Sequence, residues 1–344
     1  MRVILLGLGF WGKQWLKVLQ ADDRCEVAAV VARTNETLQA VGDEYNLDAS
    51  ICYKDSQEAI AAANADIAVV VVPPADHFDV LMQCLEADLH ILCDKPIAAT
   101  WDQAVGIAAV SKSRPAQKFM IAQTRRWSDH IQAIKRTLDS GTLGKVSFIN
   151  VDHRVHNRHP GWRQELDYPV LEDMAVHHFD AIRYFTGEDA VSVVAQSWNP
   201  PWSWYAGKAC SSALFEMTGG IRVNYFGSWC TQGEQTAWEG KIQIVGEKGS
   251  LDLVDEQTLH YYAAEPGREA GTSPEPQVVA IEPLKYREID YALHEFCEAI
   301  DQERSPECGL TENLGTFAMA CAAVESCRTG GLVRLSELID KMSR

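Results

Sequence analysis

The chain begins with an apolar run that passes directly into a glycine turn. Residues 1–6 are mostly apolar, and they are followed by Gly7-Leu8-Gly9-Phe10-Trp11-Gly12 and then a helical pattern. In this strand–turn–helix context the glycines allow a tight turn and let backbone N–H groups approach a pyrophosphate at the helix N-terminus. The alternative is a glycine turn in another α/β protein. We therefore expect an N-terminal Rossmann domain that binds a dinucleotide.

The residues after the second predicted strand bear on the choice of cofactor. Residues 26–31 form this strand, and Ala32-Arg33-Thr34 follow it. About twenty residues beyond the turn, NAD enzymes commonly place an Asp or Glu that binds both ribose hydroxyls. Here a guanidinium replaces the carboxylate, which suits the 2′-phosphate of NADP, although Arg33 could also be solvated or stack on the adenine. We expect NADP to be preferred over NAD through Arg33 and Thr34.

Two more buried strands are predicted to end in polar motifs. Residues 65–72 run into Pro73-Pro74-Ala75-Asp76-His77, and residues 89–93 run into Asp94-Lys95-Pro96. In an open parallel sheet, ligands gather outside the carboxyl ends of the strands. Lys95 is therefore a candidate proton donor or hydroxyl ligand. The alternative is a solvated lysine at a strand end.

Beyond residue 122 the pattern changes to alternating polar and apolar residues, which is typical of a half-exposed antiparallel sheet. The predicted strands are residues 146–155, 191–198, 211–217, 221–229 and 241–245. We expect a Rossmann domain over residues 1–122 and, over residues 123–344, an α+β domain with a large, mostly antiparallel open sheet. Two final helices, near residues 288–301 and 311–328, are expected to pack on this second domain.

The segment Leu171-Glu172-Asp173-Met174-Ala175-Val176-His177-His178-Phe179-Asp180 is predicted to be one helix with two faces. Asp173, His177 and Asp180 recur at helical spacing on one face, and apolar residues recur on the other. A histidine one turn from a carboxylate can be held in one tautomer for proton transfer near neutral pH. The alternative is a surface helix with solvated polar groups.

Composition narrows the class of function. The chain has 344 residues, of which 47% are hydrophobic and 23% charged, and its net charge is −17. This charge disfavours nucleic acid and anionic membranes as partners, and small-molecule chemistry is favoured. Ten scattered cysteines and the lack of a cationic leader or a membrane-spanning apolar run indicate a cytoplasmic protein with free thiols.

Two other groups of residues have competing interpretations. His153, His156 and His159 are spaced by three on a strand that enters a loop, which does not bring their rings together, so we expect no catalytic metal. Trp198, Trp202, Trp204 and Tyr205 could stack on a sugar, but aromatic residues on an open sheet more often bury a subunit interface. We expect a homo-oligomer that forms through this sheet.

Taken together, these motifs resemble the glucose–fructose oxidoreductase / inositol dehydrogenase (Gfo/Idh/MocA) family over nearly the whole chain. The resemblance rests on the glycine turn, Pro73-Pro74 with His77, Asp94-Lys95-Pro96, Trp162-Arg163, Asp173 with His177 and Asp180, residues 246–251 and residues 326–330. It implies a nicotinamide-dependent redox reaction on a sugar or cyclitol.

The resemblance also implies roles for individual residues. Lys95 would hydrogen-bond the reacting hydroxyl, His177 would be the general acid/base, and Asp173 would orient His177 or bind a neighbouring hydroxyl. The cofactor would be bound by Gly7, Gly9, Phe10, Trp11, Gly12, Arg33, Thr34, Pro73, Pro74, His77, Asp94, Lys95, Trp162 and Arg163.

Two departures from the family pattern limit what the resemblance implies. Asp94 stands where the family usually has Glu, which should alter only the support around Lys95. Residues 167–171 are bulkier than the usual glycine-rich run, so the identity of the substrate does not carry over. Two alternatives to the dehydrogenase stay open: a redox-assisted NAD-dependent glycosidase, and a nonenzymatic dinucleotide-sensing regulator.

Overall fold

The computed structural model describes residues 1–340, and the chain forms two compact units. The first comprises residues 1–124 and 286–314, and the second comprises residues 125–285 and those from 315 onward. The chain first passes from one unit to the other after residue 124, close to the domain boundary predicted after residue 122. Residues 286–314 return to the first unit, whereas the sequence pattern placed them in the second domain.

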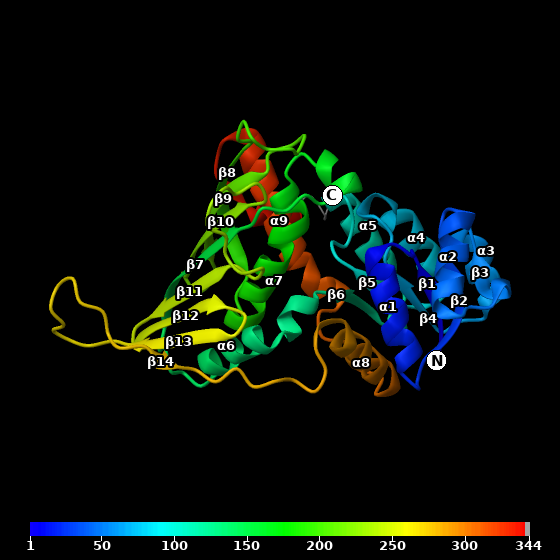
Figure 1. Cartoon of the computed structure of the whole chain (residues 1–344), viewed down its shortest axis with the longest axis horizontal. Helices are drawn as coiled ribbons and strands as arrows, with labels where there is room; N and C mark the ends of the chain where they lie inside the picture. The colour runs from blue at the N-terminus through cyan, green and yellow to red at the C-terminus, as the bar shows by residue number, and fades with distance from the viewer. Residues whose placement is uncertain (341–344) are drawn as a thin grey trace. The chain divides into compact units, whose positions relative to one another are not determined.

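The first unit contains a six-stranded parallel sheet in the order β3-β2-β1-β4-β5-β6 (Figure 1). Its elements in chain order are β1 (Arg2–Leu6), α1 (Phe10–Ala21), β2 (Glu26–Val31), α2 (Asn35–Tyr45), β3 (Cys52–Tyr53), α3 (Ser56–Ala63), β4 (Ile67–Val70), α4 (Pro74–Glu86), β5 (His90–Asp94), α5 (Trp101–Lys112), β6 (Phe119–Ala122) and α8 (Glu288–Asp301). Strands alternate with helices along the chain, and the expected Rossmann fold is confirmed.

Burial explains the composition of the central strands. Strands β1, β4 and β5 are almost continuously apolar, and their central residues are fully buried. Parallel strands that are covered by helices on both faces have no solvated side, so polar and apolar residues do not alternate along them. Helix α8 has the predicted bounds, but it packs against α1 and β6 of this unit instead of the second domain.

The second unit is built on a nine-stranded sheet in the order β14-β13-β12-β11-β7-β10-β9-β8-β15, in which only β7 and β10 pair in parallel. Its elements are α6 (Asp129–Asp139), β7 (Val146–Arg154), α7 (Ala175–Thr186), β8 (Ala190–Trp198), β9 (Cys210–Met217), β10 (Arg222–Ser228), β11 (Lys241–Gly246), β12 (Gly249–Asp255), β13 (Thr258–Ala263), β14 (Gln277–Val278), β15 (Val333–Arg334) and α10 (Leu335–Asp340). Helix α9 (Leu310–Thr329) begins in the first unit and continues into the second. The predicted mostly antiparallel open sheet is confirmed.

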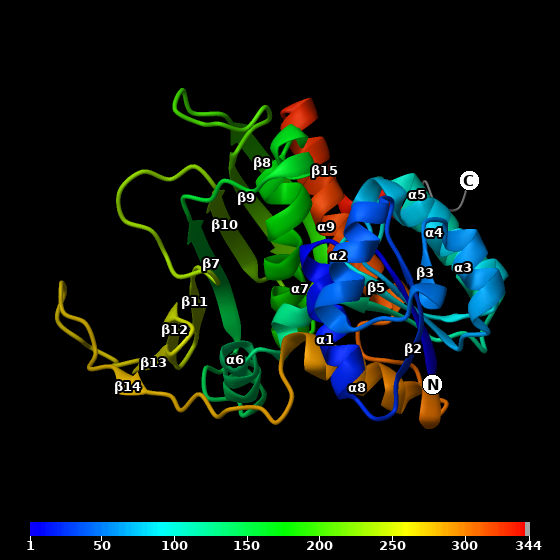
Figure 2. The ribbon, with the colours of Figure 1, turned by 45° about the vertical axis from the view of Figure 1, so that its right-hand side comes forward.

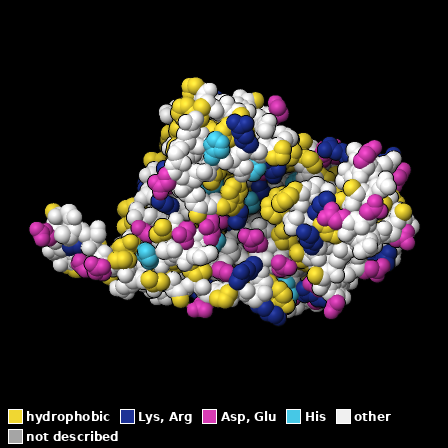
Figure 3. Space-filling model, viewed as in Figure 1, with side chains coloured by type: hydrophobic (Ala, Val, Ile, Leu, Met, Phe, Trp, Pro, Cys, Tyr) yellow, Lys and Arg dark blue, Asp and Glu magenta, His cyan; other side chains and the backbone are white. Residues whose placement is uncertain are grey.

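One face of this sheet is covered by helices, as Figures 1 and 2 show for α7 and α9. Phe179 of α7 packs edge-on against Phe215 and Tyr225, which point inward from β9 and β10. Between β13 and β14, residues 264–276 form a long loop that extends from the sheet edge and carries exposed charged side chains (Figures 1 and 3). Within residues 1–340, no helix combines the length and the apolar character needed to cross a membrane.

Candidate active site

The glycine turn has the shape that a pyrophosphate requires. Gly7 has φ +108°, and a Cβ there would lie 2.6 Å from the carbonyl oxygen of Val71, while a Cβ at Gly12 would lie 2.0 Å from that of Gly7. Gly9 caps the N-terminus of α1, has open space around its missing Cβ, and is followed by no acidic residue in the first turn. Open backbone at an uncompensated helix N-terminus favours an anion, so these residues fit the pyrophosphate of a dinucleotide.

Arg33 and Thr34, which were predicted to bind the adenosine part of the cofactor, already make contacts within the first unit. The Thr34 hydroxyl caps α2, since it accepts a hydrogen bond from the Thr37 N–H at 3.2 Å and donates to the Thr37 hydroxyl at 3.0 Å. The Arg33 side chain is 80% exposed, and its Nη1 lies 3.8 Å from Oδ2 of Asp76 in the first turn of α4. Asp76 was not among the predicted site residues. Phe10 and Trp11, the first two residues of α1, are exposed and form an edge-on ring pair.

Lys95 directly follows β5, at the carboxyl-end edge of the parallel sheet where the Gly9 turn also lies. The Lys95 N–H donates to the Asp94 carboxylate at 2.8 Å, so Asp94 folds back on the turn and supports its backbone. Pro73 caps α4 and Pro74 is its first residue, which fixes the start of that helix.

His77 supports the same edge from inside the protein. Its Nε2 lies 2.9 Å from the Val72 carbonyl oxygen and its Nδ1 lies 3.3 Å from that of Ile97, so the ring joins the loops that follow β4 and β5. The side chain is fully buried, and burial lowers the pKa of His77. His77 therefore braces the two loops, and its contact with the cofactor stays a prediction.

In the second unit, the predicted helix over residues 171–180 is not regular. Val170–Met174 forms a single π-helical turn, and α7 begins only at Ala175. Such turns add a residue to the helical repeat and often occur at functional sites. The simple i, i+4, i+7 face that was predicted for Asp173, His177 and Asp180 is therefore incorrect, because Asp173 lies in the wider turn.

Asp173 and Asp180 of this segment are each paired with an arginine. Arg163 Nε donates to Asp173 Oδ2 at 2.6 Å, and the Arg163 guanidinium lies 4.4 Å from the centre of the Trp162 ring. Asp180 is buried and accepts two hydrogen bonds from Arg126, at 2.8 and 2.5 Å. Asp180 therefore anchors α7 to the segment that precedes α6, a role that the sequence pattern did not predict.

A buried polar cluster beside α7 was also missed by sequence reasoning. Glu239 is fully buried, and its Oε2 lies 3.4 Å from both Arg125 Nη1 and His130 Nε2. Burial alone would raise the pKa of Glu239, but the Arg125 guanidinium and the adjacent His130 ring lower it to about 2. His178 contacts the Glu239 backbone oxygen through Nε2. In the sequence, His178 beside His177 was the one local indication that a second polar side chain of this helix could be buried.

The three histidines considered as metal ligands have different surroundings. His153 is fully buried beside the rings of His178 and Trp238, and burial lowers its pKa to about 3. His156 lies against the Thr231 carbonyl oxygen, and His159 lies 3.0 Å from Asn157 Nδ2. The rings of His153 and His159 both lie near Trp238, whereas that of His156 lies near Trp204; that the three bind no catalytic metal stays a prediction.

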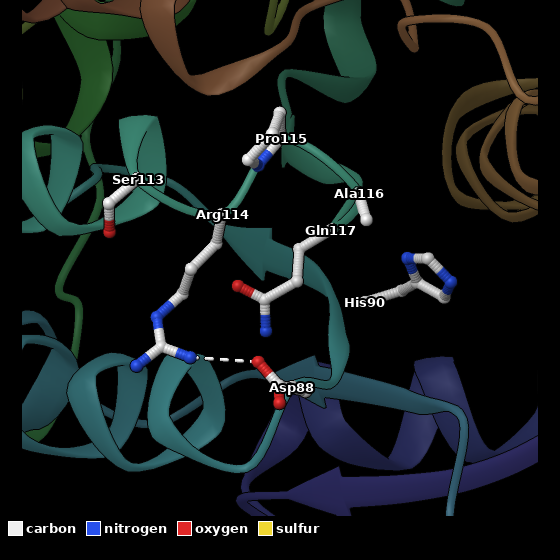
Figure 4. A pocket seen from close by; sticks show the side chains of 7 residues that line it. All are labelled: Asp88, His90, Ser113, Arg114, Pro115, Ala116 and Gln117. Atoms are coloured by element: carbon white, nitrogen blue, oxygen red, sulfur yellow. Dashed lines mark hydrogen bonds and ion pairs between the residues drawn. The ribbon is translucent and has the colours of Figure 1, made fainter.

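A pocket of about 670 Å³ occurs on the first unit, but at the other edge of its sheet (Figure 4). It is lined by Asp88, His90, Ser113, Arg114, Pro115, Ala116 and Gln117, which lie where β5 and β6 begin. Arg114 is paired with Asp88 at 2.8 Å. Because ligands in open parallel sheets bind at the carboxyl ends of the strands, we do not assign this pocket to the redox site.

Comparison with known proteins agrees with this architecture. Residues 1–122 match the family described as "Oxidoreductase family, NAD-binding Rossmann fold", and residues 131–252 match the "GFO/IDH/MocA C-terminal domain". The uncharacterized protein y4oX of Sinorhizobium fredii is 26% identical over 350 residues, which is 98% of this chain and 96% of that protein. D-apiose dehydrogenase of Paraburkholderia graminis is 23% identical over 342 residues, which is 97% of this chain and 89% of that protein.

A solved structure shares the fold over the full length. An oxidoreductase from Agrobacterium radiobacter, in complex with NAD+, L-tartaric acid and magnesium, has a TM-score of 0.87 and 20% identity, covering 98% of this chain and 99% of that one. A Rossmann unit followed by an open-sheet unit, with each part matching its family domain, defines the class of protein. The chain belongs to the Gfo/Idh/MocA oxidoreductase family.

Proposed function

We propose that this protein transfers a hydride between a nicotinamide dinucleotide and a CH–OH group of a sugar or cyclitol. The observation that carries the proposal is the edge of the parallel sheet in the first unit. There Gly9 leaves open space at the start of α1, and Lys95 follows β5 at the same edge. A cation beside a dinucleotide cradle is suited to a reacting oxygen that gains or loses a proton during hydride transfer.

In this proposal the chain divides the proton chemistry among three side chains. Lys95 donates a hydrogen bond to the reacting oxygen. His177 takes the hydroxyl proton during oxidation and returns it during reduction. Asp173, held by Arg163, orients His177 or binds a neighbouring substrate hydroxyl. When bound, the nicotinamide supplies the acceptor or donor of the hydride.

The relatives support a polyhydroxylated substrate. D-apiose dehydrogenase, whose name specifies a sugar, aligns with almost the entire chain. Residues 167–171, which include the bulky Tyr168 just before the π-helical turn and Val170 at its start, set this chain apart from the family's glycine-rich pattern. We propose a sugar-like substrate whose shape differs from that of the substrates bound beside a glycine-rich segment.

The test is a screen of sugars, cyclitols and keto-sugars with NAD(H) and NADP(H), followed by nicotinamide absorbance. With an active substrate, Lys95→Met should lower kcat by roughly 10²–10⁴-fold while dinucleotide binding is kept. Lys112→Met is the matched control, because this exposed lysine ends α5 and should be replaceable without loss of activity. Near-normal turnover by Lys95→Met would refute the assignment of Lys95.

The same screen, extended to glycosides, distinguishes the two alternatives. A redox-assisted glycosidase would release a sugar from a glycoside without net change in nicotinamide absorbance. A dinucleotide-sensing regulator would bind the nucleotide and turn over none of the substrates. The paired Asp173 and the strand-end Lys95 favour the dehydrogenase, since a sensor has no need for this set.

We also propose that NADP is preferred over NAD. Arg33 is exposed at the end of β2, and Ala32 leaves no carboxylate at the usual ribose position. The Asp76 carboxylate near Arg33 opposes this preference, because it competes with a 2′-phosphate for the guanidinium. The balance between these two side chains is therefore expected to set the cofactor preference.

The open face of the nine-stranded sheet is proposed to join copies of the chain. Val194 and Leu214 are cross-strand neighbours on β8 and β9, and both are exposed. Beside them a ladder of side-chain hydrogen bonds crosses four strands, from Asn224 to Asn150 at 3.3 Å, from Asn150 to Gln243 at 3.1 Å and from Gln243 to Asp252 at 3.1 Å. Polar groups that are already paired can be buried at smaller cost, so this face suits a homo-oligomeric interface.

The cysteines support a reducing location for this chemistry. All ten are free thiols. Proteins of oxidising compartments commonly pair such cysteines in disulfides, whereas cytosolic proteins keep them reduced. We propose that the enzyme works in the cytoplasm.

A further inference from the structure

Two cysteines from distant parts of the chain meet in the first unit. Cys25 directly precedes β2, and Cys297 lies in α8, which packs against α1 (Figures 1 and 2). Their sulfur atoms are 4.0 Å apart, although the residues are separated by 272 positions. A disulfide needs sulfur atoms at about 2.05 Å, so oxidation must bring these two sulfur atoms about 2 Å closer.

The two thiols differ in access, as a reaction in two steps requires. Cys297 is buried, whereas Cys25 is only half-buried. Beside Cys25, Arg24 pairs with Asp22 at 2.5 Å. The hydrogen bond from the Cys297 thiol lowers the pKa of Cys25, and the nearby guanidinium acts in the same direction. Cys25 can therefore present a thiolate to a soluble reagent while Cys297 is shielded.

We propose that Cys25 and Cys297 form a thiol–disulfide site that reacts with small disulfides of the glutathione type. The Cys25 thiolate attacks one sulfur of the oxidised reagent, forms a mixed disulfide and releases one reduced thiol. The Cys297 thiol then loses its proton and attacks the Cys25 sulfur, which releases the second reduced thiol. Two protein thiols are oxidised and one reagent disulfide is reduced, so the electrons balance.

The bond has a structural consequence for the first unit. Helix α8 belongs to this unit, but the chain reaches it only after passing through residues 125–285 of the second unit. A covalent bond from Cys25 to Cys297 of α8 would close a chain loop that spans 272 positions. Because the unfolded chain loses more freedom when a longer loop is closed, oxidation should raise the melting temperature of this unit, by roughly 5–10 °C.

A second thiol pair in the chain provides a built-in comparison. Cys210 and Cys230 are even closer, with sulfur atoms 3.7 Å apart, but both are buried in the second unit. The hydrogen bond from Cys210 also lowers the pKa of Cys230, to about 6, so if proximity and thiol pKa alone decided reactivity, this pair would oxidise first. The structure instead favours the pair with one accessible thiol, because a reagent must first reach a sulfur atom.

The experiment is incubation of the reduced full-length protein with oxidised glutathione, alkylation of the remaining thiols, trypsin digestion and mass spectrometry without reduction. Each relevant tryptic peptide contains one cysteine: residues 25–33 and 288–304 for the proposed pair, and residues 209–222 and 223–241 for the comparison pair. We expect the first two peptides to be recovered as one disulfide-linked species. The oxidised protein should melt higher, and a reducing thiol should reverse the change.

Two variants separate the steps. Cys297→Ala should retain glutathione on Cys25 as a stable mixed disulfide, because no second thiol resolves it. Cys25→Ser should leave Cys297 unmodified in the folded protein. Linkage of residues 209–222 to 223–241 before the proposed pair, or an unmodified Cys25 in both wild type and Cys297→Ala, would overturn the proposal.

Discussion

The exposed pair formed by Arg33 and Asp76 offers a quantitative test of how the first unit selects its cofactor. A guanidinium that binds the 2′-phosphate of NADP contributes about 1.5–3 kcal/mol through a charge-assisted hydrogen bond. Arg33→Ala should therefore weaken NADPH binding by roughly tenfold to a hundredfold or more. NADH has no phosphate at this position, so its dissociation constant should change by much less.

Asp76→Asn should act in the opposite direction and more weakly. The pair is 80% and 46% exposed and its charged atoms are 3.8 Å apart, and such a pair is worth at most about 1 kcal/mol. Freeing Arg33 from this carboxylate should strengthen NADPH binding by about two- to fivefold. If Asp76 acts through Arg33, most of this gain should disappear in the double variant.

The assay is fluorescence titration of NADH and NADPH into wild type, both single variants and the double variant. Arg114→Ala is the matched control, because Arg114 is also paired with an aspartate but lies at the opposite edge of the same sheet. Selective loss of NADPH affinity in Arg33→Ala supports a phosphate contact. Parallel loss of both nucleotides would show that Arg33 stacks on the adenine, and tighter NADH binding by wild type would refute the NADP preference.

Three more predictions concern the second unit. The kcat/KM for oxidation should rise with pH through the imidazole range, and His177→Ala should remove that inflection; an unchanged inflection would identify another base. Burial lowers the pKa of His153 to about 3 from 6.5, so as pH falls below about 7 the unfolded chain binds protons first and stability is lost. His153→Gln should therefore abolish ~2 kcal/mol of the decrease in unfolding free energy between pH 7 and pH 5, measured by urea unfolding, and an equal decrease in both proteins would contradict this. Leu214→Arg on the open sheet face should reduce the molar mass in light scattering, whereas Leu332→Arg, an exposed residue outside this sheet, should not; equal masses would argue against the interface.

The sequence was most informative where local pattern alone determines structure. The apolar strands and the glycine turn predicted the first unit. A buried parallel strand is almost continuously apolar, and a tight turn before a dinucleotide-binding helix is rich in glycine. The same argument succeeded for the half-exposed strands of the second sheet. Helix α8 was placed in the wrong unit, because an amphipathic pattern shows that a helix has a buried face and not what covers it.

The site was harder to predict because its supporting contacts are long-range. Arg126 meets Asp180 across 54 positions, and Glu239 meets Arg125 and His130 across more than a hundred. No local spacing encodes such pairs. The π-helical turn was missed for a related reason, since one additional residue per turn leaves the apolar pattern almost unchanged while it moves Asp173 off the regular helix face.

The two arginine pairs suggest why an imidazole, and not a carboxylate, should exchange the proton on this segment. Asp173 and Asp180 each accept charge-assisted hydrogen bonds from a guanidinium. Protonating either carboxylate would weaken those bonds, at a cost of about 1.5–3 kcal/mol each, and in Asp180 it would also leave Arg126 buried beside a neutral partner. His177 lies between these two acids in sequence and takes part in neither arginine pair, and an imidazole is the side chain whose ordinary pKa lies nearest neutral pH. In the proposed mechanism the acids thus keep the helix in place through the reaction cycle, and the proton exchange is assigned to His177.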